Sequence, residues 1–273
     1  MKKNESLSLR FLYHTSPGRA ILKVLTNPVV SEKAAVYLSS PYSKWLIDYY
    51  KEKYNIDMTD CCKKNFSSFN DFFKRKKKLK LVTEDKAIIS PCDAFLSIYS
   101  IYDDLSLNIK HSRYTVSSLL RDRKIAEEFS GGICCVFRLE PHHYHRYLFA
   151  VNGRIKLQRR IKGILHCVRP IACQEYPVHI QNSRQYTLIQ NSTLGNVIQM
   201  EIGAMLVGKI CNHMKSLTAV KGQEKGYFEY GGSTIVLLFQ KNSVNLSKDF
   251  MKIMNTEIEV PVNIGQTIGK ELR

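Results

Sequence analysis

The stretch Gly226–Phe239, GYFEYGGSTIVLLF, holds two runs rich in aromatic and β-branched residues, which are typical of β-strands. Between the runs stands Gly231-Gly232-Ser233-Thr234, where neither strand needs an interruption. A hairpin turn or a β-bulge is the structural explanation for these four residues. The chemical explanation is a serine placed where glycine lets the main chain take an unusual conformation.

The rest of the chain sets the class of protein. It has 273 residues, 44% of them hydrophobic, which allows a sizeable core without disulfides. The eight cysteines include no CxxC, and adjacent pairs such as Cys61-Cys62 are poor ligands of one tetrahedral zinc, so we expect reduced thiols, a cytoplasmic protein and no metal site. No apolar run has the length of a signal peptide core or a membrane span, so we expect neither.

The net charge of +17 is concentrated at the front, where residues 1–80 carry 17 Lys and Arg against 7 Asp and Glu. Phe69, Phe72 and Phe73 form one helical stripe that leads into the basic residues of segment 74–80. A solvated helix face is one explanation, and a surface that lies on an anionic bilayer is the other. Nucleic acid is a competing partner, but no zinc-finger, RNA-recognition or helix-turn-helix pattern supports it.

The first third of the chain carries helix signals, with apolar residues at helical spacing between them. Asn27-Pro28 is expected to end the first helix. Helix starts are predicted at Ser16-Pro17, with the serine as the cap, at Ser31 and at Ser40-Pro41.

The pattern changes to short β-rich runs after Lys86, and serial strands without regular intervening helices argue against a doubly wound nucleotide-binding fold. We therefore predict an α+β protein, with amphipathic N-terminal helices in residues 1–80 and a β-rich core of two packed sheets in residues 81–273. The predicted strands include Ala87–Ile89, Phe95–Ile98, Ile133–Phe137, Gln185–Ile189 and Val197–Ile202.

Gly203–Ile210, GAMLVGKI, is a near match to the phosphate-binding loop GxxxxGK[ST]. Ile210 stands where the magnesium-binding hydroxyl belongs, and the intervening residues are bulky and apolar. A buried strand with close backbone approach at Gly203 and Gly208 is therefore the favoured interpretation.

Two further segments hold candidate catalytic groups. Glu140–Tyr147, EPHHYHRY, has three histidines within four residues; these are often surface or core residues, but histidine is also the natural proton shuttle near neutral pH. Ser90–Ala94, SPCDA, places Asp93 in a turn, where an aspartate commonly bonds its own backbone.

Ser233 offers a reaction that no other part of the chain suggests. A serine hydroxyl can attack the carbonyl of the preceding residue and convert the amide to an ester. β-Elimination of that ester releases a new carboxyl terminus and leaves a dehydroalanine, which hydrolyses to a pyruvoyl group. The product is a ketone electrophile that no encoded side chain supplies.

Seven segments in order resemble phosphatidylserine decarboxylases of the shorter bacterial type, over roughly residues 68–240. The order and number of these segments are far more specific than any one motif. They are SFNDFFKRK (68–76), SPCDA (90–94), RLEPHHYHRY (138–147), LHCVRPIA (165–172), NSRQYTLI (182–189), MEIGAMLVGKI (200–210) and KGQEKGYFEYGGSTIVLLF (221–239).

The resemblance implies a proenzyme that cuts itself between Gly232 and Ser233 into a β chain of residues 1–232 and an α chain of residues 233–273. Ser233 would become the covalent pyruvoyl cofactor, Asp93 would help to activate the serine, and His145 is the candidate proton donor. The serine head group would form a Schiff base with the pyruvoyl group, lose carbon dioxide and leave as phosphatidylethanolamine.

One residue departs from the family pattern, in which Tyr-His-Arg-x-x-His is common. Here Leu148 stands at the second histidine, which assists self-cleavage in relatives. Either His145 serves both steps, or His142 or His143 substitutes, or Asp93 acts with little help. An inactive relative is the remaining alternative.

The resemblance also implies a setting for the reaction, which is the cytoplasmic face of the cell membrane, where a peripheral enzyme would meet phosphatidylserine in an anionic bilayer. The partners would then be lipid, the protein's own α and β chains and a second copy of the chain, with no nucleic acid. The rival functions are an inactive binder of anionic lipid and a pyruvoyl decarboxylase of a soluble amino acid.

Overall fold

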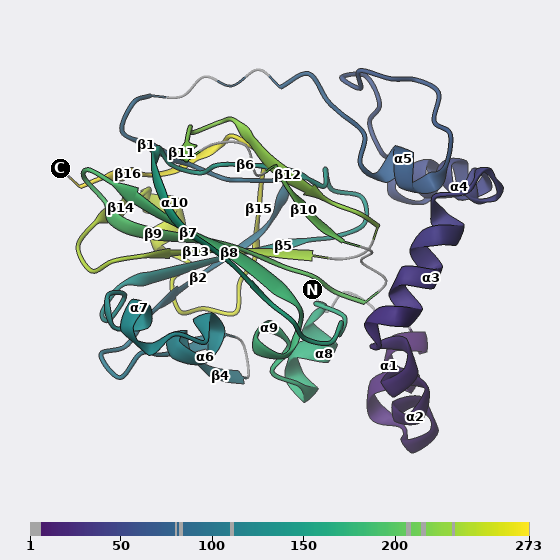
Figure 1. Ribbon diagram of the computed structural model, residues 1–273, viewed down its shortest axis with the longest axis horizontal. Coiled ribbons are helices and arrows are strands. Elements are labelled where there is room, and N and C mark those ends of the chain that lie inside the picture. Colours follow the sequence, from purple (N-terminus) through teal and green to yellow (C-terminus); the bar gives the residue numbers. More distant parts are fainter. Residues whose placement is uncertain are drawn as a thin grey trace.

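A computed structural model gives the arrangement of the chain and describes residues 7–79, 81, 84–109, 112–205, 209–213, 217–230 and 233–272. Helices at the N-terminal end stand beside a β-rich core (Figure 1). This confirms the predicted fold class. The N-terminal helices are α1 (Leu7–His14), α2 (Ser16–Leu25), α3 (Pro28–Leu38), the 3-10 turn η1 (Pro41–Ser43), α4 (Trp45–Tyr54) and α5 (Phe69–Phe73).

The caps of these helices differ from the predicted ones. Thr15, not Ser16, caps α2, and its hydroxyl accepts a hydrogen bond from the Gly18 amide at 3.0 Å. Asn27 and Pro28 begin α3 rather than only ending α2, because the Asn27 side chain accepts from the Val29 amide. The predicted start at Ser31 is therefore wrong.

The aromatic stripe of α5 is also not where the sequence suggested. Phe69, Phe72 and Phe73 are at most 1% exposed and form a small core with residues of α3 and α4. They cannot face a membrane. The basic segment that follows α5 is more open, since Lys76 and Lys78 are exposed.

The main layer of the core is an antiparallel sheet of eight strands in the order β11-β7-β8-β9-β13-β5-β2-β15. All five predicted strand runs are present, and one of them, Ala87–Ile89, lies in a smaller sheet. The strands of the large sheet are β2 (Ala94–Ser100), β5 (Ile133–Leu139), β7 (Gly153–Ile161), β8 (Arg184–Asn191), β9 (Gly195–Ile202), β11 (Thr218–Ala219), β13 (Ser233–Phe239) and β15 (Val260–Val262).

Smaller elements cover the two faces of this sheet, so the predicted second sheet is divided into smaller ones. One three-stranded sheet has the order β10-β12-β6, a second has the order β1-β16-β14, and β3 pairs with β4. Their bounds are β1 (Ala87–Ile89), β3 (Ser106–Ile109), β4 (Ser112–Thr115), β6 (Arg146–Leu148), β10 (Ile210–Asn212), β12 (Glu224–Phe228), β14 (Val244–Leu246) and β16 (Thr267–Glu271). The helices of the core are α6 (Val116–Leu120), α7 (Arg123–Glu127), α8 (Pro170–Glu175), α9 (Val178–Gln181) and α10 (Lys248–Met251).

Alternation along the strands gives the large sheet two buried faces, as expected when both sides are covered. On β13, Ile235 and Leu237 belong to the larger apolar cluster, which also contains Phe228 of β12. Val236 and Leu238 belong to a separate cluster on the other face. Ser233 is two residues before Ile235 on the same strand, so the two side chains point to the same face of the large sheet. The β10-β12-β6 sheet covers this face.

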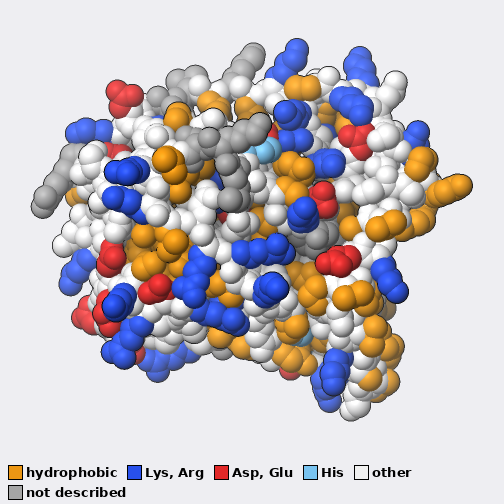
Figure 2. Space-filling model, viewed as in Figure 1, with side chains coloured by type: hydrophobic (Ala, Val, Ile, Leu, Met, Phe, Trp, Pro, Cys, Tyr) orange, Lys and Arg blue, Asp and Glu red, His pale blue; other side chains and the backbone are white. Residues whose placement is uncertain are grey.

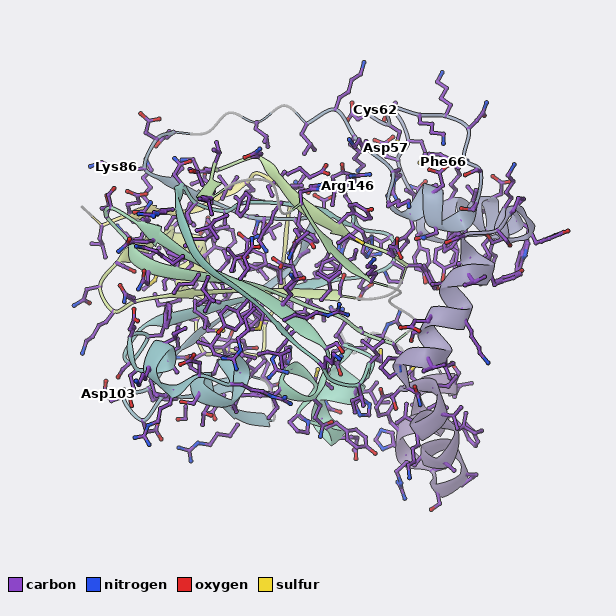
Figure 3. The ribbon with its side chains drawn as sticks, viewed as in Figure 1. Asp57, Cys62, Phe66, Lys86, Asp103 and Arg146 are labelled. Atoms are coloured by element: carbon purple, nitrogen blue, oxygen red, sulfur yellow. The ribbon has the colours of Figure 1, made fainter. Side chains whose placement is uncertain are left out.

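The N-terminal helices dock on the core at two places. Tyr13 of α1 is fully buried, and its hydroxyl accepts a hydrogen bond from the Cys167 amide at 3.1 Å. Farther along, Arg146 of β6 donates to the Lys74 carbonyl at 2.9 Å and pairs with Glu224 at 2.7 Å. Figure 3 labels Arg146 on the side of the core that faces α5. No described helix is long and apolar enough to cross a membrane.

Candidate active site

Ser233, the predicted nucleophile, is the first residue of β13 and is fully buried. β13 lies between β5 and β9, and Ser233 is opposite Leu139 of β5. The Ser233 hydroxyl has no hydrogen-bond partner among the described residues. Because an unsatisfied buried polar group costs about 1–3 kcal/mol, a hydroxyl kept in this state indicates a role other than stability.

The break before Ser233 is not a hairpin. β12 pairs with β10 and β6, whereas β13 pairs with β5 and β9, so the chain changes sheets between these two strands. Gly232, the other half of the predicted cleavage site, lies outside the described residues, as does Gly231. The hairpin explanation of the glycines is therefore wrong.

Tyr230, just ahead of this break, is held by the N-terminal helices. Its hydroxyl is 2.7 Å from that of Tyr50 in α4, and its ring packs on Phe69 and Phe73 of α5. The Tyr230 amide donates to the Asn70 side chain at 3.3 Å. The helices thus position the segment that leads to Ser233.

His145 is the only one of the three clustered histidines that is fully buried. Its ring lies against Phe73, with 3.8 Å between the ring centroids, and Phe73 in turn contacts Tyr230. The structure therefore brings His145 next to the helices that hold the segment before Ser233.

The proton on His145 can be assigned from its single hydrogen bond. Nδ1 is 2.9 Å from the His143 carbonyl oxygen, which can only accept, so Nδ1 carries the hydrogen. Burial lowers the pKa of His145 well below 6.5, and the positive charge of Arg75 lowers it further. The ring is therefore neutral at pH 7, and Nε2 is a buried acceptor with no partner among the described residues.

Asp93 follows β1 in a turn in which the Ser90 hydroxyl donates to the Cys92 carbonyl at 2.7 Å. The Asp93 carboxylate accepts from the amide of Ile264 at 2.8 Å, a residue far along the chain. The explanation of Asp93 as a turn residue that bonds its own backbone is therefore wrong, and the carboxylate instead joins two distant segments.

The register of the sheet places Asp93 and Ser233 at the same end. Ser233 is opposite Leu139, and Arg138 is opposite Phe95, so Ala94 lies level with Leu139. With strands about 4.8 Å apart, Ala94 is about 10 Å from Ser233 across the sheet. Asp93 directly precedes Ala94, the first residue of β2, and so lies just beyond the same end of the sheet at which Ser233 begins β13.

A cavity of about 220 Å³ opens beside Asp93. Arg75 lines it and is only 2% exposed, and its Nε has no partner among the described residues. The other Arg75 contacts include two carbonyls at 3.5 Å, the Phe72 ring and the Cys61 side chain. The remaining lining residues include Tyr54, Asp57, Lys77, His142, His143 and Asn263.

Arg138 fixes the wall of this cavity. It forms a two-point ion pair with Glu259, at 2.9 and 2.7 Å, and contacts Glu140 at 3.0 Å. Burial disfavours its charge, but the two carboxylates outweigh that effect and raise the pKa of Arg138. The Glu140 amide donates to Nδ1 of His143 at 2.9 Å, so this cluster also holds the histidine segment.

Sequence reasoning singled out neither Arg75 nor Arg138. Both lie in segments that carried the family resemblance, but Arg75 was taken as one member of a basic run. The signal that could have found it is its place directly after the apolar stripe of α5. A charge at the end of a buried helix needs a partner or a ligand.

Leu148, at the position of the family's second histidine, is buried in β6. Its amide donates to the Pro91 carbonyl at 2.9 Å, two residues before Asp93. The side chain at this position is thus part of the site but cannot carry a proton.

Two other sequence features lie apart from this chemistry. The near match to a phosphate-binding loop is not a continuous strand, because β9 ends at Ile202, and Gly208 lies outside the described residues. No group of His, Cys, Asp and Glu in the described part of the chain has the arrangement of a metal site.

Comparison with known proteins gives the context of this site. A sequence model of the family described as phosphatidylserine decarboxylase matches residues 69–270. The match includes Asp93, His145 and Ser233, together with Arg75 and Arg138.

Individual relatives are similar over nearly their whole length. Phosphatidylserine decarboxylase proenzyme 2 of Clostridium acetobutylicum is 41% identical over 273 residues, which cover 98% of this chain and 94% of that protein. Phosphatidylserine decarboxylase proenzymes of Clostridium tetani and Ruminiclostridium cellulolyticum are 37% and 36% identical; each alignment covers 96% of this chain, and 91% and 90% of those proteins, respectively.

Proposed function

Since this chain belongs to the phosphatidylserine decarboxylase family, we propose that it is a proenzyme that cuts itself at Gly232-Ser233 and then converts phosphatidylserine to phosphatidylethanolamine. The observation that carries the proposal is the buried hydroxyl of Ser233 at the start of a central strand, which has no hydrogen-bond partner in the described part of the chain. This is a hydroxyl free to attack the main chain.

The fold supports a cut at this place. Strand β13 would be the first element of the α chain, residues 233–273, and it is hydrogen-bonded on both sides to strands of the β chain, residues 1–232. The two chains therefore stay together after cleavage, with the new terminus buried at the site.

The residues present fit a pyruvoyl group made from Ser233, because the Oγ of that serine takes part in no other contact among the described residues. Once formed, this group supplies the electron sink that α-decarboxylation needs. The amine of the serine head group must lose a proton before it can react as a nucleophile, and Nε2 of the neutral His145 is a suitable acceptor. The same nitrogen can return the proton to the α-carbon after carbon dioxide leaves.

Asp93 and the cavity beside it complete the proposed site. Arg75 and Lys77 provide positive charge for the phosphate of the head group, and the Nε of Arg75, for which the described residues offer no partner, is available to donate to it. We assign Asp93 a part in activating Ser233, on the resemblance to the family and on its place at the same end of the sheet.

The N-terminal region, residues 1–80, would hold the enzyme on the membrane. Among the described residues, ten of the 18 exposed large hydrophobic side chains are in residues 7–49, including Val36 at 74%, Tyr42 at 82% and Trp45 at 62% exposed. Figure 2 shows apolar side chains gathered along the side of α1 to α4, at the right, with Lys and Arg near them. Apolar side chains beside basic ones suit an anionic bilayer surface.

We place the enzyme on the cytoplasmic leaflet as a peripheral protein. All eight cysteines are unpaired, as expected in a reducing compartment. Residues 81–273 would then be the catalytic core, held at the surface by the helices.

Intact-mass analysis of the purified chain tests the proposal. The wild type should give two fragments, the lighter beginning with a blocked pyruvoyl end, and should release carbon dioxide from phosphatidylserine vesicles. Ser233→Ala should remain a single chain without activity. A wild type that stays whole while folded and bound to vesicles would support the inactive lipid-binding relative, and activity on free serine alone would support the soluble-substrate enzyme.

A further inference from the structure

A buried ion pair lies on the same face of the large sheet as Ser233. The ammonium of Lys225 is 2.6 Å from Oε2 of Glu201, and the two side chains are 1% and 0% exposed. Such a pair gives little or no net stability, because the loss of hydration offsets the attraction between the charges. Its presence in the core therefore calls for another explanation.

The local fold directs both side chains inward. Lys225 lies at a β-bulge of β12, where the pairing with β6 shifts register between Glu224 and Gly226. A bulge turns one side chain away from the regular alternation, and here it turns Lys225 toward the large sheet. Glu201 meets it from β9.

Glu201 is a diagonal neighbour of Ser233. It is directly opposite Ile235 on β13, and Ser233 is two residues before Ile235 on the same face. Diagonal neighbours in antiparallel strands are about 7–8 Å apart between Cα atoms, within the reach of a long side chain. The side chains of Glu201 and Ser233 therefore rise from adjacent positions.

Both residues have a buried oxygen without a partner among the described residues. Oε2 of Glu201 accepts from Lys225 and, at 3.0 Å, from Asn212, but Oε1 has none, and neither has the Ser233 hydroxyl. Burial raises the pKa of Cys92, and the charges of Asp93 and Glu201 raise it further. Ser233, Asp93 and Glu201 thus share one end of the sheet.

We infer that Glu201 is the base that takes the proton of Ser233 during self-cleavage, and that Lys225 holds this carboxylate in place. The inference rests on the proposed function. The Ser233 oxygen forms a bond to the carbonyl carbon of the preceding residue, and its proton passes to Oε1 of Glu201. The bond from that carbon to the Ser233 nitrogen then breaks, and Glu201 returns the proton to the departing amine. No other reactant is needed for the shift from amide to ester.

The other side chains of the site make other contacts or carry no proton. The Asp93 carboxylate accepts from the Ile264 amide on the side of β15, and the His145 ring is tilted against Phe73. Leu148 has no proton to exchange. Glu201 is the carboxylate that the sheet register places next to Ser233 on its own face.

The test follows the rate of chain cleavage in full-length protein by intact mass, with hydroxylamine added to trap the ester. Glu201→Gln should slow cleavage by at least about 100-fold. Because this variant leaves Lys225 unpaired, the double variant Glu201→Leu/Lys225→Met is measured beside it. That variant replaces the ion pair with apolar side chains of similar volume, which cores tolerate, and it should be equally slow. Thermal unfolding against uncleaved Ser233→Ala shows that it is folded.

Two further variants separate a chemical role from a structural one. Thr187→Val alters a buried polar residue of β8, opposite Gln199 and on the same face of the sheet, whose hydroxyl has no partner among the described residues, and it should cleave at the wild-type rate. In a Ser233→Cys background, Glu201→Gln should slow cleavage much less, because a thiol loses its proton far more readily than a hydroxyl.

Wild-type cleavage in the double variant, or equal slowing in Thr187→Val, would overturn the role of Glu201. The role of Glu201 would also be overturned if Glu201→Gln slowed cleavage as much in the Ser233→Cys background as it does in the wild type. A wild-type chain that never cleaves would instead overturn the proposed function itself.

Discussion

Helices α1–α4 expose apolar side chains, whereas the β-rich core buries polar ones. In the helices, Trp45 and Val36 are more than half exposed. In the core, Ser233, His145 and Glu201 are fully buried, each with an atom that lacks a partner among the described residues. Apolar side chains are usually buried and polar ones exposed, and the two regions depart from this rule in opposite directions. The difference separates the surface proposed to meet lipid from the site proposed to act on it.

The largest expected effect is on the rate of decarboxylation, and it tests the buried polar groups of the β-rich core. His145→Gln should lower the rate of decarboxylation by about 10²- to 10⁴-fold, because the side chain that replaces the imidazole cannot accept and return a proton. Chain cleavage should continue, since Glu201 is assigned to that step. The measurement is carbon dioxide release from phosphatidylserine together with intact mass. Activity near the wild-type level would remove His145 from the mechanism, and an uncleaved chain would mean that it serves both steps.

The next effect tests the apolar surface of the helices. The combined variant Val36→Ser, Tyr42→Ser and Trp45→Ser should reduce binding to phosphatidylserine vesicles by at least about 10-fold, because each side chain loses apolar area that the bilayer would bury. Vesicle flotation gives the binding. Activity toward a short-chain substrate in detergent should remain.

Two exposed apolar residues of the core provide the matched control. Leu217→Ser and Ile258→Ser change side chains that are 75% and 57% exposed but lie outside the helices. Their binding should match that of the wild type. Equal losses from both sets would show that the helices have no special part in binding.

A smaller effect is expected at the boundary of the two regions, in the cavity beside Asp93. Lys77→Met should raise the KM for phosphatidylserine about 3- to 10-fold with kcat unchanged, because one partly exposed charge contact with the phosphate contributes about 1 kcal/mol. Lys76→Met is the control, since Lys76 is exposed and does not line the cavity. The same KM in both variants would argue against phosphate binding here.

The last effect concerns acid stability where the helices dock on the core. Burial lowers the pKa of His166, which packs against Tyr13, to about 4. An unfolded histidine has a pKa near 6.5, so between these two values the unfolded chain binds more protons and stability falls as the pH falls. The free energy of unfolding lost in this way amounts to at most about 3 kcal/mol, and the loss is absent well above pH 6.5.

Urea unfolding of the uncleaved Ser233→Ala protein at pH 7.5, 5.5 and 4.5 measures this effect. Added His166→Gln should flatten the decline over that interval. If the free energy of unfolding falls with pH as steeply in this variant as without it, groups other than His166 control the loss of stability in acid.

Much of the candidate site was predictable from local sequence. The five strand runs were found because alternating β-branched and aromatic residues carry their own signal. Asp93, His145 and Ser233 were found because each is part of a segment with a family pattern. The register then brings Asp93 and Ser233 to one end of the sheet.

Where local signals competed, the sequence led to errors. Asn27-Pro28 is both a suitable end for one helix and a cap for the next, and only the packing of the helices decides between them. Phe69, Phe72 and Phe73 have the spacing of any apolar helix face, so their pattern could not distinguish a protein core from a membrane surface.

The sequence by itself determined which chemistry is available, because a serine after two glycines, a histidine and an aspartate are each visible in short segments. Only the tertiary structure decided which groups are buried, which nitrogen of His145 is free and which carboxylate lies next to Ser233. Glu201 and Lys225 are 24 positions apart and have no shared motif, yet a bulge and a strand register bring them within 2.6 Å. Such pairings depend on long-range contacts, which the order of residues in a short segment does not contain.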